Sequence, residues 1–336
     1  MKKETKKTLI FLILSLVSFG IVFAIALMVG QYNIRIDDFF KAIFTNDATY
    51  KIQRSIIINL RLPRAIVASL SGIALSVSGL LYQEIFQNKL TSPDLLGVSS
   101  GSAVGASFAL VLGLSSVLVS LFSFIMGIIT VLLTILLSKL FRNGKTMTLI
   151  LAGIIVGGFM SALLSLIKYY ADPTTILTSI TYWLMGSFEN STMKIVYIMF
   201  PVVAASCIVL LTLSWRINIV ALGEEEAQPK GINYKLYKYL IIGISTLLTA
   251  VSVSFNGTIS WVGLVIPHIV RLITGRETQR SIPLCITFGG IFMVIVDILS
   301  RTFTISEIPV SAITGLLGTA VFVIILLIKR RDFNVH

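Results

Sequence analysis

The sequence predicts an all-α, polytopic membrane protein with about ten transmembrane helices and both termini in the cytoplasm. Hydrophobic residues make up 56% of the 336 residues, and charged residues make up only 12%. Soluble domains carry about 25% charged residues, so this chain cannot cover a water-exposed surface of its size. Apolar runs of about 20 residues, the length of one membrane crossing, recur along the chain. Residues 1–336 are therefore predicted to form a single transmembrane domain, and an ordinary globular enzyme is excluded.

The first apolar run, residues 8–30, follows a lysine-rich start. A cleaved signal peptide is the alternative interpretation, because Ala24-Ile25-Ala26 resembles a cleavage site. The apolar stretch is about 23 residues long, whereas signal peptides use about 7–15. We therefore expect a retained first helix.

Nine further runs are candidate spans. They cover residues 62–82, 95–112, 116–138, 147–168, 194–214, 238–255, 258–274, 282–300 and 308–328. The run at 258–274 is short and is interrupted by Gly263 and Pro267. Another apolar piece, 176–188, is too short to span and predicts a re-entrant or interfacial helix.

Positive charge predicts the orientation. With the amino terminus inside, 18 of the 27 Lys and Arg residues fall on the cytoplasmic side, as the positive-inside rule requires. Six of the nine outside charges crowd into residues 31–64. The basic residues lie singly or in small groups between apolar runs, so the net charge of +12 does not indicate nucleic-acid binding.

Small residues recur at helical spacing. Gly97, Gly101 and Gly105 stand four residues apart, and Gly153 and Gly157 repeat the interval. Such spacing allows helix backbones to approach closely in lipid. It predicts close helix packing and carries no information about a substrate.

No catalytic or cofactor motif survives inspection. Gly144-Lys145-Thr146 resembles the end of a phosphate-binding loop, but position 139 is Lys where the motif requires Gly. His268 stands near a span end, where a structural role is expected. Cys207 and Cys285 lie inside apolar runs without a CxxC motif, so neither a disulfide nor a metal site is predicted. We expect no catalytic residues, no metal and no cofactor bound by this chain.

Charges deep in the spans are scarce. Asp297 is the deepest, and Arg301 follows four residues later on the same helix face, where it can neutralise the carboxylate. The missing ion relay weakens the alternative of an ion-coupled secondary transporter without removing it. A polytopic membrane enzyme would need a catalytic constellation, and none is found.

The longest cytoplasmic insert, at about 216–236, predicts a short helix at the inner face. Acidic residues favour the positive amino-terminal end of a helix, and glycine favours its end. From the residues alone, a docking surface for a soluble partner and a solvated loop are equally supported. The residues concerned are Leu222, Gly223, Glu224, Glu225, Glu226, Ala227 and Gly231.

An ordered series of motifs resembles the FecCD-type permeases of ABC importers for iron-siderophores, haem and vitamin B12. The motifs lie at residues 60–64 (LRLPR), 78–83, 95–101 (LLGVSSG), 151–154 (LAGI), 183–187 (WLMGS), 257–268, 297–301 (DILSR) and 307–310 (EIPV). Each motif alone is weak, but their order along nearly the whole chain is specific.

The resemblance implies an iron-siderophore permease of the bacterial plasma membrane, with haem or vitamin B12 as alternative substrates. It further implies a second permease subunit, identical or related, and an external substrate-binding protein. Two cytoplasmic ATPase subunits would bind the ATP and Mg²⁺. Transport would then depend on these partners within the lipid bilayer.

The resemblance also implies roles for residues. Segment 222–232 would rest on the ATPase as the coupling helix. Arg61, Arg64 and Arg301 would face outward and meet acidic residues of the binding protein, which would explain the excess outside charge.

The transport pathway would be lined by the fifth span and by the 176–188 helix, again by resemblance. Within the fifth span, Met160, Ser161 and Leu164 are the predicted lining residues.

Three departures from the family pattern are present. Lys89 and Ala320 stand where the family usually has proline. Pro229-Lys230 replaces a small residue and a leucine in the predicted coupling segment. We expect the last departure to change the details of docking, because proline removes a backbone N–H and lysine adds charge.

Overall fold

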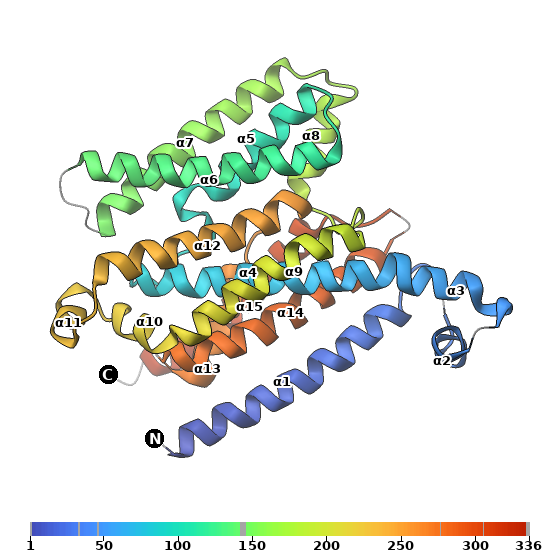
Figure 1. The fold of residues 1–336 in the computed structure, drawn as a ribbon, viewed down its shortest axis with the longest axis horizontal. Coiled ribbons are helices and arrows are strands. Elements are labelled where there is room, and N and C mark those ends of the chain that lie inside the picture. Colours follow the sequence, from blue (N-terminus) through green and yellow to red (C-terminus); the bar gives the residue numbers. More distant parts are fainter. Residues whose placement is uncertain are drawn as a thin grey trace.

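The computed structural model describes residues 2–32, 34–45, 47–141, 146–275, 277–304 and 306–333. Its long helices run roughly side by side (Figure 1). The inner end of the bundle carries the start of α1 (Lys2–Met28), α11 (Glu224–Ala227) and the end of α15 (Val310–Phe333). The outer end carries α2 (Ile36–Phe44) and α3 (Lys51–Ser55). The inner end is the one that the positive charge assigns to the cytoplasm.

A helix covers most of each predicted span. Besides α1 and α15 these are α4 (Leu62–Ile85), α5 (Val98–Val111), α6 (Ser116–Leu140), α7 (Thr146–Tyr170), α9 (Met193–Thr212), α12 (Tyr234–Asn256), α13 (Val262–Thr274) and α14 (Thr278–Thr302). Within the described residues, seven helices are long and apolar enough to cross a membrane, while α5, α13 and the described apolar part of α15 are shorter. The helical fold is confirmed, and ten crossings with cytoplasmic termini stay a prediction. The predicted short helix is α8 (Ile176–Met185).

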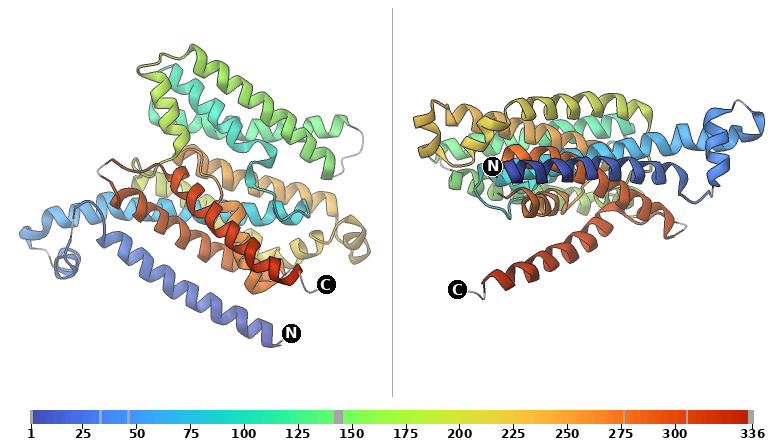
Figure 2. Two further views of the ribbon diagram at one scale, coloured as in Figure 1. Left: turned by 180° about the vertical axis from the view of Figure 1, so that it is seen from behind. Right: turned by 90° about the horizontal axis from the view of Figure 1, so that it is seen from below.

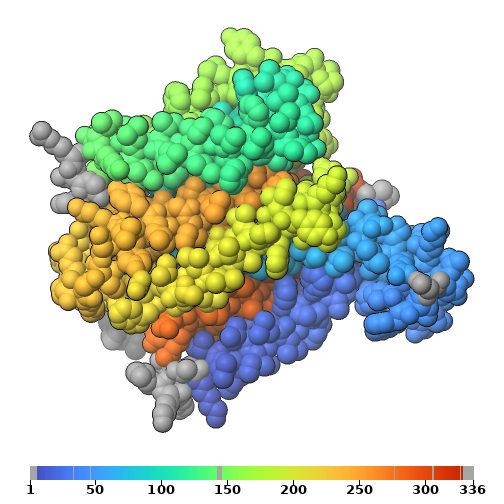
Figure 3. Space-filling model, viewed as in Figure 1, coloured from blue at the N-terminus to red at the C-terminus, as the bar shows by residue number. Residues whose placement is uncertain are grey.

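The segment before the second span is helical rather than a loop. The elements η1 (Ala48–Tyr50), α3 and the π-helix η2 (Ile56–Arg61) continue directly into α4. The continuous helical run that leads into the second span therefore begins at Ala48, well before residue 62. The turns added in front of α4 project beyond the bundle at the outer end (Figure 3).

Helix α2 runs across the ends of the spanning helices instead of along them (Figures 1 and 2). Phe39 and Ala42 are buried against the chain. Ile36, Phe40 and Phe44 follow at intervals of four and are exposed. One side of α2 thus anchors the helix to the bundle, and a second apolar stripe faces outward.

The core is built around α4. Of the most apolar 18-residue stretch of this helix, which we call its apolar window, 89% is buried. At its crossing with α14, a Cβ added to Gly72 would lie 2.0 Å from the carbonyl oxygen of Gly289. At its crossing with α13, a Cβ on Gly79 would lie 1.9 Å from the carbonyl oxygen of Gly263. Backbones pack directly at both points. In lipid, where apolar burial gives little driving force between helices, such close packing stabilises their association.

The predicted glycine contacts are present between α5, α6 and α7. A Cβ on Gly101 or Gly105 would lie 1.9 or 2.3 Å from atoms of α6, and one on Gly153 would lie 2.2 Å from the chain before α5. A Cβ on Gly97 would lie 3.0 Å from the Thr130 side chain of α6 and 3.5 Å from the Cα of Gly157, whereas one on Gly157 would have its nearest neighbour 3.8 Å away. The prediction of close packing is confirmed for Gly97, Gly101, Gly105 and Gly153, and the contact at Gly157 is an ordinary van der Waals contact.

Several helices leave apolar faces uncovered. Only 11% of the apolar window of α1 and 22% of that of α7 are buried. Helix α1 runs along one edge of the molecule, and α15 diverges from the main bundle (Figure 2). Faces of this size need lipid or another subunit to cover them.

The histidine and the cysteines occupy structural positions. Cys207 and Cys285 are buried free thiols. His268 is buried and lies edge-on to the ring of Phe322, with 5.7 Å between ring centroids. These placements agree with the packing roles predicted for them.

Candidate functional site

A buried charge cluster ties helices together at the outer end. Arg64, near the start of α4, donates to both carboxylate oxygens of Glu307 at 2.5 and 2.8 Å. Its Nε donates to Asp297 at 2.6 Å. The Nε of Arg301 lies 3.3 Å from the other oxygen of Asp297, which confirms the pair predicted from their spacing. The cluster joins α4, α14 and the segment that leads to α15.

Two arginines, Arg61 and Arg301, close the end of α1. Arg61 donates to the carbonyl oxygens of Leu27 and Met28 at 3.0 and 2.6 Å, and to that of Tyr32. Arg301 donates to the carbonyl oxygen of Ala26 at 2.6 Å. The last carbonyl groups of a helix have no partner within it and carry partial negative charge, so a guanidinium there is stabilising.

The three predicted docking arginines therefore do not face outward. Arg61, Arg64 and Arg301 are 4%, 9% and 5% exposed. The expectation of outward orientation is wrong for this structure, because carboxylates and backbone carbonyls of the same chain hold the guanidinium groups beneath the surface. A buried charge is tolerable only with such partners. Their part in docking stays a prediction.

Four exposed basic residues precede Arg61 in the chain, within the segment that contains α2 and α3. They are Arg35, Lys41, Lys51 and Arg54. The excess of outside charge found in the sequence thus divides into a buried structural part and an exposed part.

At the inner end, the predicted short helix is present. Gly223, at φ 107°, precedes α11, and Gly231, at φ 71°, follows the 3₁₀ turn η4 (Gln228–Lys230). The three acidic residues occupy the first turn and are exposed, as is Leu222. Ala227 is fully buried and anchors the segment. The local shape is confirmed, and its role in coupling to an ATPase stays a prediction.

The unusual Pro229-Lys230 pair fits this geometry. Pro229 lies in the first turn of η4, where its missing N–H costs little. Lys230 lies 3.7 Å from Glu226, one turn earlier, and both side chains are exposed. The departure therefore leaves the segment's fold intact and changes only its outer surface.

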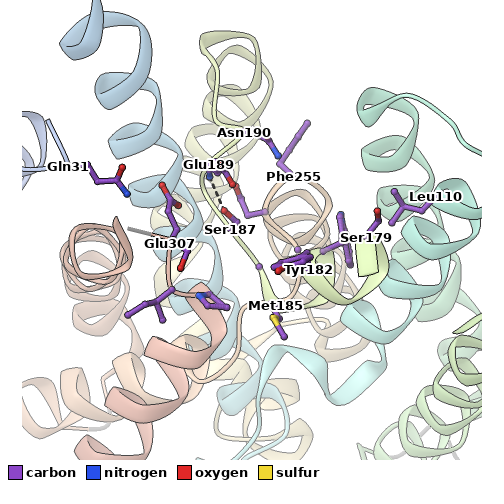
Figure 4. Close-up of a pocket in the computed structure, with 17 residues that line it drawn as sticks. Gln31, Leu110, Ser179, Tyr182, Met185, Ser187, Glu189, Asn190, Phe255 and Glu307 are labelled. Atoms are coloured by element: carbon purple, nitrogen blue, oxygen red, sulfur yellow. Dashed lines mark hydrogen bonds between the residues drawn. The ribbon is translucent and has the colours of Figure 1, made fainter. Parts of the chain in front are cut away.

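An outer cavity of about 610 Å³ opens beside α8. Figure 4 shows Glu307 on one side of it and Ser179 and Tyr182 on the other. Glu189, Asn190 and further polar groups complete its wall. The cavity thus has a polar wall formed by segments that lie far apart in the sequence.

An inner cavity of about 500 Å³ lies between α5, α7 and the 3₁₀ turn η3 (Pro93–Leu96). Of the predicted pathway residues, Ser161 and Leu164 line it. Met160 does not line it, because this side chain is 2% exposed and packs with Val104 and Val156. Consecutive helical residues point in directions about 100° apart, so Met160 and Ser161 face different sides of α7.

Two acidic residues of the cavity walls were missed in the sequence. Asp94 lines the inner cavity and accepts a hydrogen bond from the Ser99 hydroxyl. Glu189 lines the outer cavity just after α8. A signal was available, since each stands a few residues from a motif glycine: Asp94 before Gly97 and Glu189 after Gly186.

These features together define the class of the protein. Apolar helices of spanning length, cavities at the outer end and between helices, and an exposed helical segment at the inner end are those of a multi-pass membrane permease. The model of the FecCD transport family matches residues 16–329, and the chain belongs to this family.

Relatives and solved structures agree with this membership. The chain is 35% identical over 332 residues to the molybdate import system permease protein MolB of Haemophilus influenzae, covering 97% of this chain and 96% of that protein. It is 35% identical over 275 residues to a protein of Helicobacter pylori named "Probable iron chelatin transport system permease protein", covering 82% and 83%. A solved structure titled "An inward-facing conformation of a putative metal-chelate type ABC transporter" matches with a TM-score of 0.86 and 34% identity, over 94% of this chain and 98% of that one. The chain is thus a permease of the ABC importer class.

Proposed function

We propose that this chain is the membrane-spanning subunit of an ATP-driven importer that takes up iron-siderophore complexes across the bacterial plasma membrane. Haem and vitamin B12 are the alternative substrates. Family membership and the names of relatives support import of metal chelates, and the molybdate relative adds a small oxyanion to the possibilities.

The observation that favours a chelate over an oxyanion is the charge of the cavity walls. Glu189 and Glu307 line the outer cavity, and Asp94 lines the inner one. Among the described residues, no Lys or Arg lines either cavity. Glu307 is neutralised by Arg64, but a doubly negative ion would still meet Glu189 in the outer cavity and Asp94 in the inner one, with no basic residue lining either wall. A bulky neutral or cationic chelate with many hydrogen-bonding groups suits these walls better.

Partners complete the proposed machine. A second permease subunit would cover the exposed apolar face of α7. Two ATPase subunits would rest on residues 222–232, and an external binding protein would dock at the outer end. Arg61, Arg64 and Arg301 would set the shape of that outer face from beneath, while the exposed arginines and lysines would attract an acidic partner. ATP binding and hydrolysis in the partner would switch the helices between two discrete packings.

The substrate is tested by uptake into proteoliposomes that contain this chain and its ATPase. We expect uptake of a neutral ferric trihydroxamate to require ATP on the side of the membrane that carries the ATPase. This uptake should exceed that of molybdate and of a trianionic ferric tricatecholate. Uptake of haem and of cobalamin is measured in the same assay. Uptake driven by an ion gradient without ATP would contradict the importer class, and preferred molybdate uptake would contradict the substrate.

The coupling segment is tested with two matched leucines at the inner end. Leu222 is 55% exposed within residues 222–232, and Leu236 is 58% exposed in the first turn of α12, which follows them. We expect Leu222→Asp to abolish copurification of the ATPase and Leu236→Asp to leave it unchanged. Equal effects of the two substitutions would remove this assignment.

The docking face is tested by charge reversal at two depths. Lys51→Glu with Arg54→Glu changes exposed charges, and we expect weaker binding of the external protein, most clearly at low salt. Arg61→Glu or Arg64→Glu should instead lower the amount of folded protein, because these side chains are buried. Unchanged affinity after the exposed reversals would exclude this surface.

A further inference from the structure

Helix α2 carries an apolar stripe that the described part of the chain leaves uncovered. Ile36, Phe40 and Phe44 stand one turn apart and are 63%, 54% and 79% exposed. The rings of Phe40 and Phe44 are stacked, with 6.4 Å between their centroids, so they form one surface. Asp37 and Lys41 are also exposed, and each follows a residue of the stripe, about 100° further around the helix. The exposed surface of α2 is therefore divided into an apolar side and a charged side.

The orientation of α2 is that of a helix lying along a membrane surface. It runs across the ends of the spanning helices instead of beside them (Figures 1 and 2). Its nine residues make it about 14 Å long, which is too short to cross a bilayer. Amphipathic helices in this orientation rest with the apolar side at the boundary between headgroups and acyl chains and with the charged side in water.

The turn from α1 into α2 keeps the stripe near the outer end of α1. Arg61 donates to the carbonyl oxygens of Leu27 and Met28, at the end of α1, and to that of Tyr32, shortly before α2. A Cβ on Gly30, within the same turn, would lie 2.9 Å from a guanidinium nitrogen of Arg61. One buried side chain thus fixes the path by which the chain leaves the first span. The depth of α2 is therefore tied to the depth of α1.

The stripe continues an uncovered apolar surface of α1. Toward the outer end of that helix, Ile25 and Val29 are 42% and 39% exposed, and Tyr32 beyond it is 47% exposed. Tyrosine is enriched at the boundary between membrane and water. Helices α1 and α2 lie at the edge of the molecule opposite α7 (Figure 1). Since the second permease subunit proposed above covers α7, lipid is left to cover the edge that α1 and α2 form.

The charges of α2 favour lipid over an acidic protein as the occupant of this surface. Arg35 and Lys41 are balanced by Asp37 and Asp38, so residues 35–44 carry no net charge. The two acidic residues occupy the first turn, where the helix dipole stabilises them. An acidic protein would gain no net attraction from α2, whereas zwitterionic headgroups offer both signs of charge. The excess positive charge of this region lies instead on α3.

We propose that α2 is an interfacial anchor whose apolar stripe enters the outer leaflet of the membrane, between the headgroups and the acyl chains. The charged side of the helix faces water. Arg61 is the positioning residue that holds the helix at this depth. The anchor fixes the level of α1 and of the helical segment that leads into α4. The assignment of lipid rests in part on the proposed function, because that function places another subunit on α7.

The anchor is tested with spin labels on single cysteines of the full chain in lipid nanodiscs, without binding protein or ATPase. The native Cys207 and Cys285 are first replaced by alanine. Electron paramagnetic resonance then measures collisions of the label with oxygen, which concentrates among acyl chains, and with a water-soluble nickel complex. We expect oxygen to dominate at Phe40→Cys, at a depth of about 5–10 Å. At the matched control, Lys41→Cys, we expect the nickel complex to dominate.

Two results would overturn the anchor. Dominance of the nickel complex at Phe40→Cys would place the stripe in water. Few collisions with either probe would show that protein, such as a second copy of the chain, covers it. Ile36→Cys and Phe44→Cys repeat the measurement on the same stripe if Phe40→Cys fails to accumulate. The experiment needs neither substrate nor ATP, so a failed anchor leaves the proposed import function standing, and a failed uptake assay leaves this result interpretable.

The positioning role is tested by exchanging one buried arginine at a time. Arg61→Lys keeps the positive charge but cannot reach all three carbonyl oxygens at once. We expect it to move the label at Phe40→Cys toward water, with more collisions with the nickel complex. The control is Arg64→Lys, because Arg64 is equally buried in the outer end but binds Glu307 and Asp297 instead of the turn. Equal label depths in the two variants would overturn the role of Arg61.

Discussion

Helices α14 and α7 look alike in sequence and behave differently in the fold. Both have 25 residues, and the mean hydropathies of their most apolar 18-residue stretches are 2.3 and 2.4. Yet 56% of the apolar window of α14 is buried inside the chain, against 22% for α7. Hydropathy measures how readily a segment leaves water. It does not say whether protein or lipid then surrounds it.

The difference comes from which residues line each helix face. Helix α14 presents Gly289 to α4 and Asp297 to two arginines, so its contacts are close and specific. Helix α7 presents large apolar side chains such as Ile155 and Phe159 away from the chain. A core helix thus needs small and paired polar residues, whereas a helix at the rim needs only bulk apolar surface.

The largest effect should follow from breaking the charge cluster on α14. Asp297→Ala leaves Arg64 and Arg301 buried beside each other, and we expect a loss of about 3–5 kcal/mol in unfolding free energy. The exposed pair Glu226 and Lys230 is the control, where Glu226→Ala should cost at most about 1 kcal/mol. Unfolding in an SDS titration measures both, and similar costs would contradict the assignment of a buried cluster.

The next largest difference between the two helices should follow from truncating one large side chain on each. Met293 of α14 is fully buried, whereas Phe159 of α7 is 59% exposed. We expect Met293→Ala to cost about 2 kcal/mol, at the low end of values for soluble cores because lipid supplies no hydrophobic transfer term. Phe159→Ala removes more atoms and should cost less in the isolated subunit. The same titration decides, and a costlier Phe159→Ala would show that protein covers this face.

Adding a single methyl group should discriminate between glycines on the two helices. A Cβ on Gly289 would lie 2.4 Å from the carbonyl oxygen of Gly72, whereas one on Gly158 of α7 would meet nothing within 4 Å. We expect Gly289→Ala to destabilise by about 1–3 kcal/mol and Gly158→Ala to be neutral or slightly stabilising. Thermal unfolding in detergent compares them, and equal melting temperatures would argue against direct backbone packing at the crossing.

The smallest expected effect lies in the loop after α7. Hydrogen bonds from Thr174 and Thr175 lower the pKa of the exposed Asp172 carboxyl to about 2. A lowered pKa stabilises the folded loop above the ordinary value near 3.8, and this stabilisation is lost as the pH falls through about 2. Hydrogen exchange in residues 172–178 should therefore rise between pH 4 and 2, beyond the intrinsic change. Asp172→Asn should remove that extra dependence, and its persistence would exclude the carboxylate as its source.

Much of the fold followed from local patterns. Apolar length located the helices, intervals of four located the close approach at Gly101 and Gly105, and the i, i+4 rule located the Asp297–Arg301 pair. The helix at 224–227 followed from acids and a glycine at its ends. In each case the interacting groups lie within one helix or present one repeating face, so sequence spacing fixes their geometry.

The candidate site was less predictable. Ser161 and Leu164 do line a cavity and Met160 does not, because the rotation of α7 is set by its neighbours. The three arginines were expected on the surface, and their burial depends on acceptors far away in the chain. Glu307 lies 243 residues after Arg64, and no local spacing relates them.

The sequence by itself determined that this protein resides in a membrane, where its helices lie and which family it belongs to. Composition and short-range spacing carry that information, because they act through transfer to lipid and through neighbours on one helix. Only the tertiary structure decided which charges are paired, which faces stay open and which residues line each cavity. Those outcomes depend on contacts between distant segments, which exist only once the chain has packed.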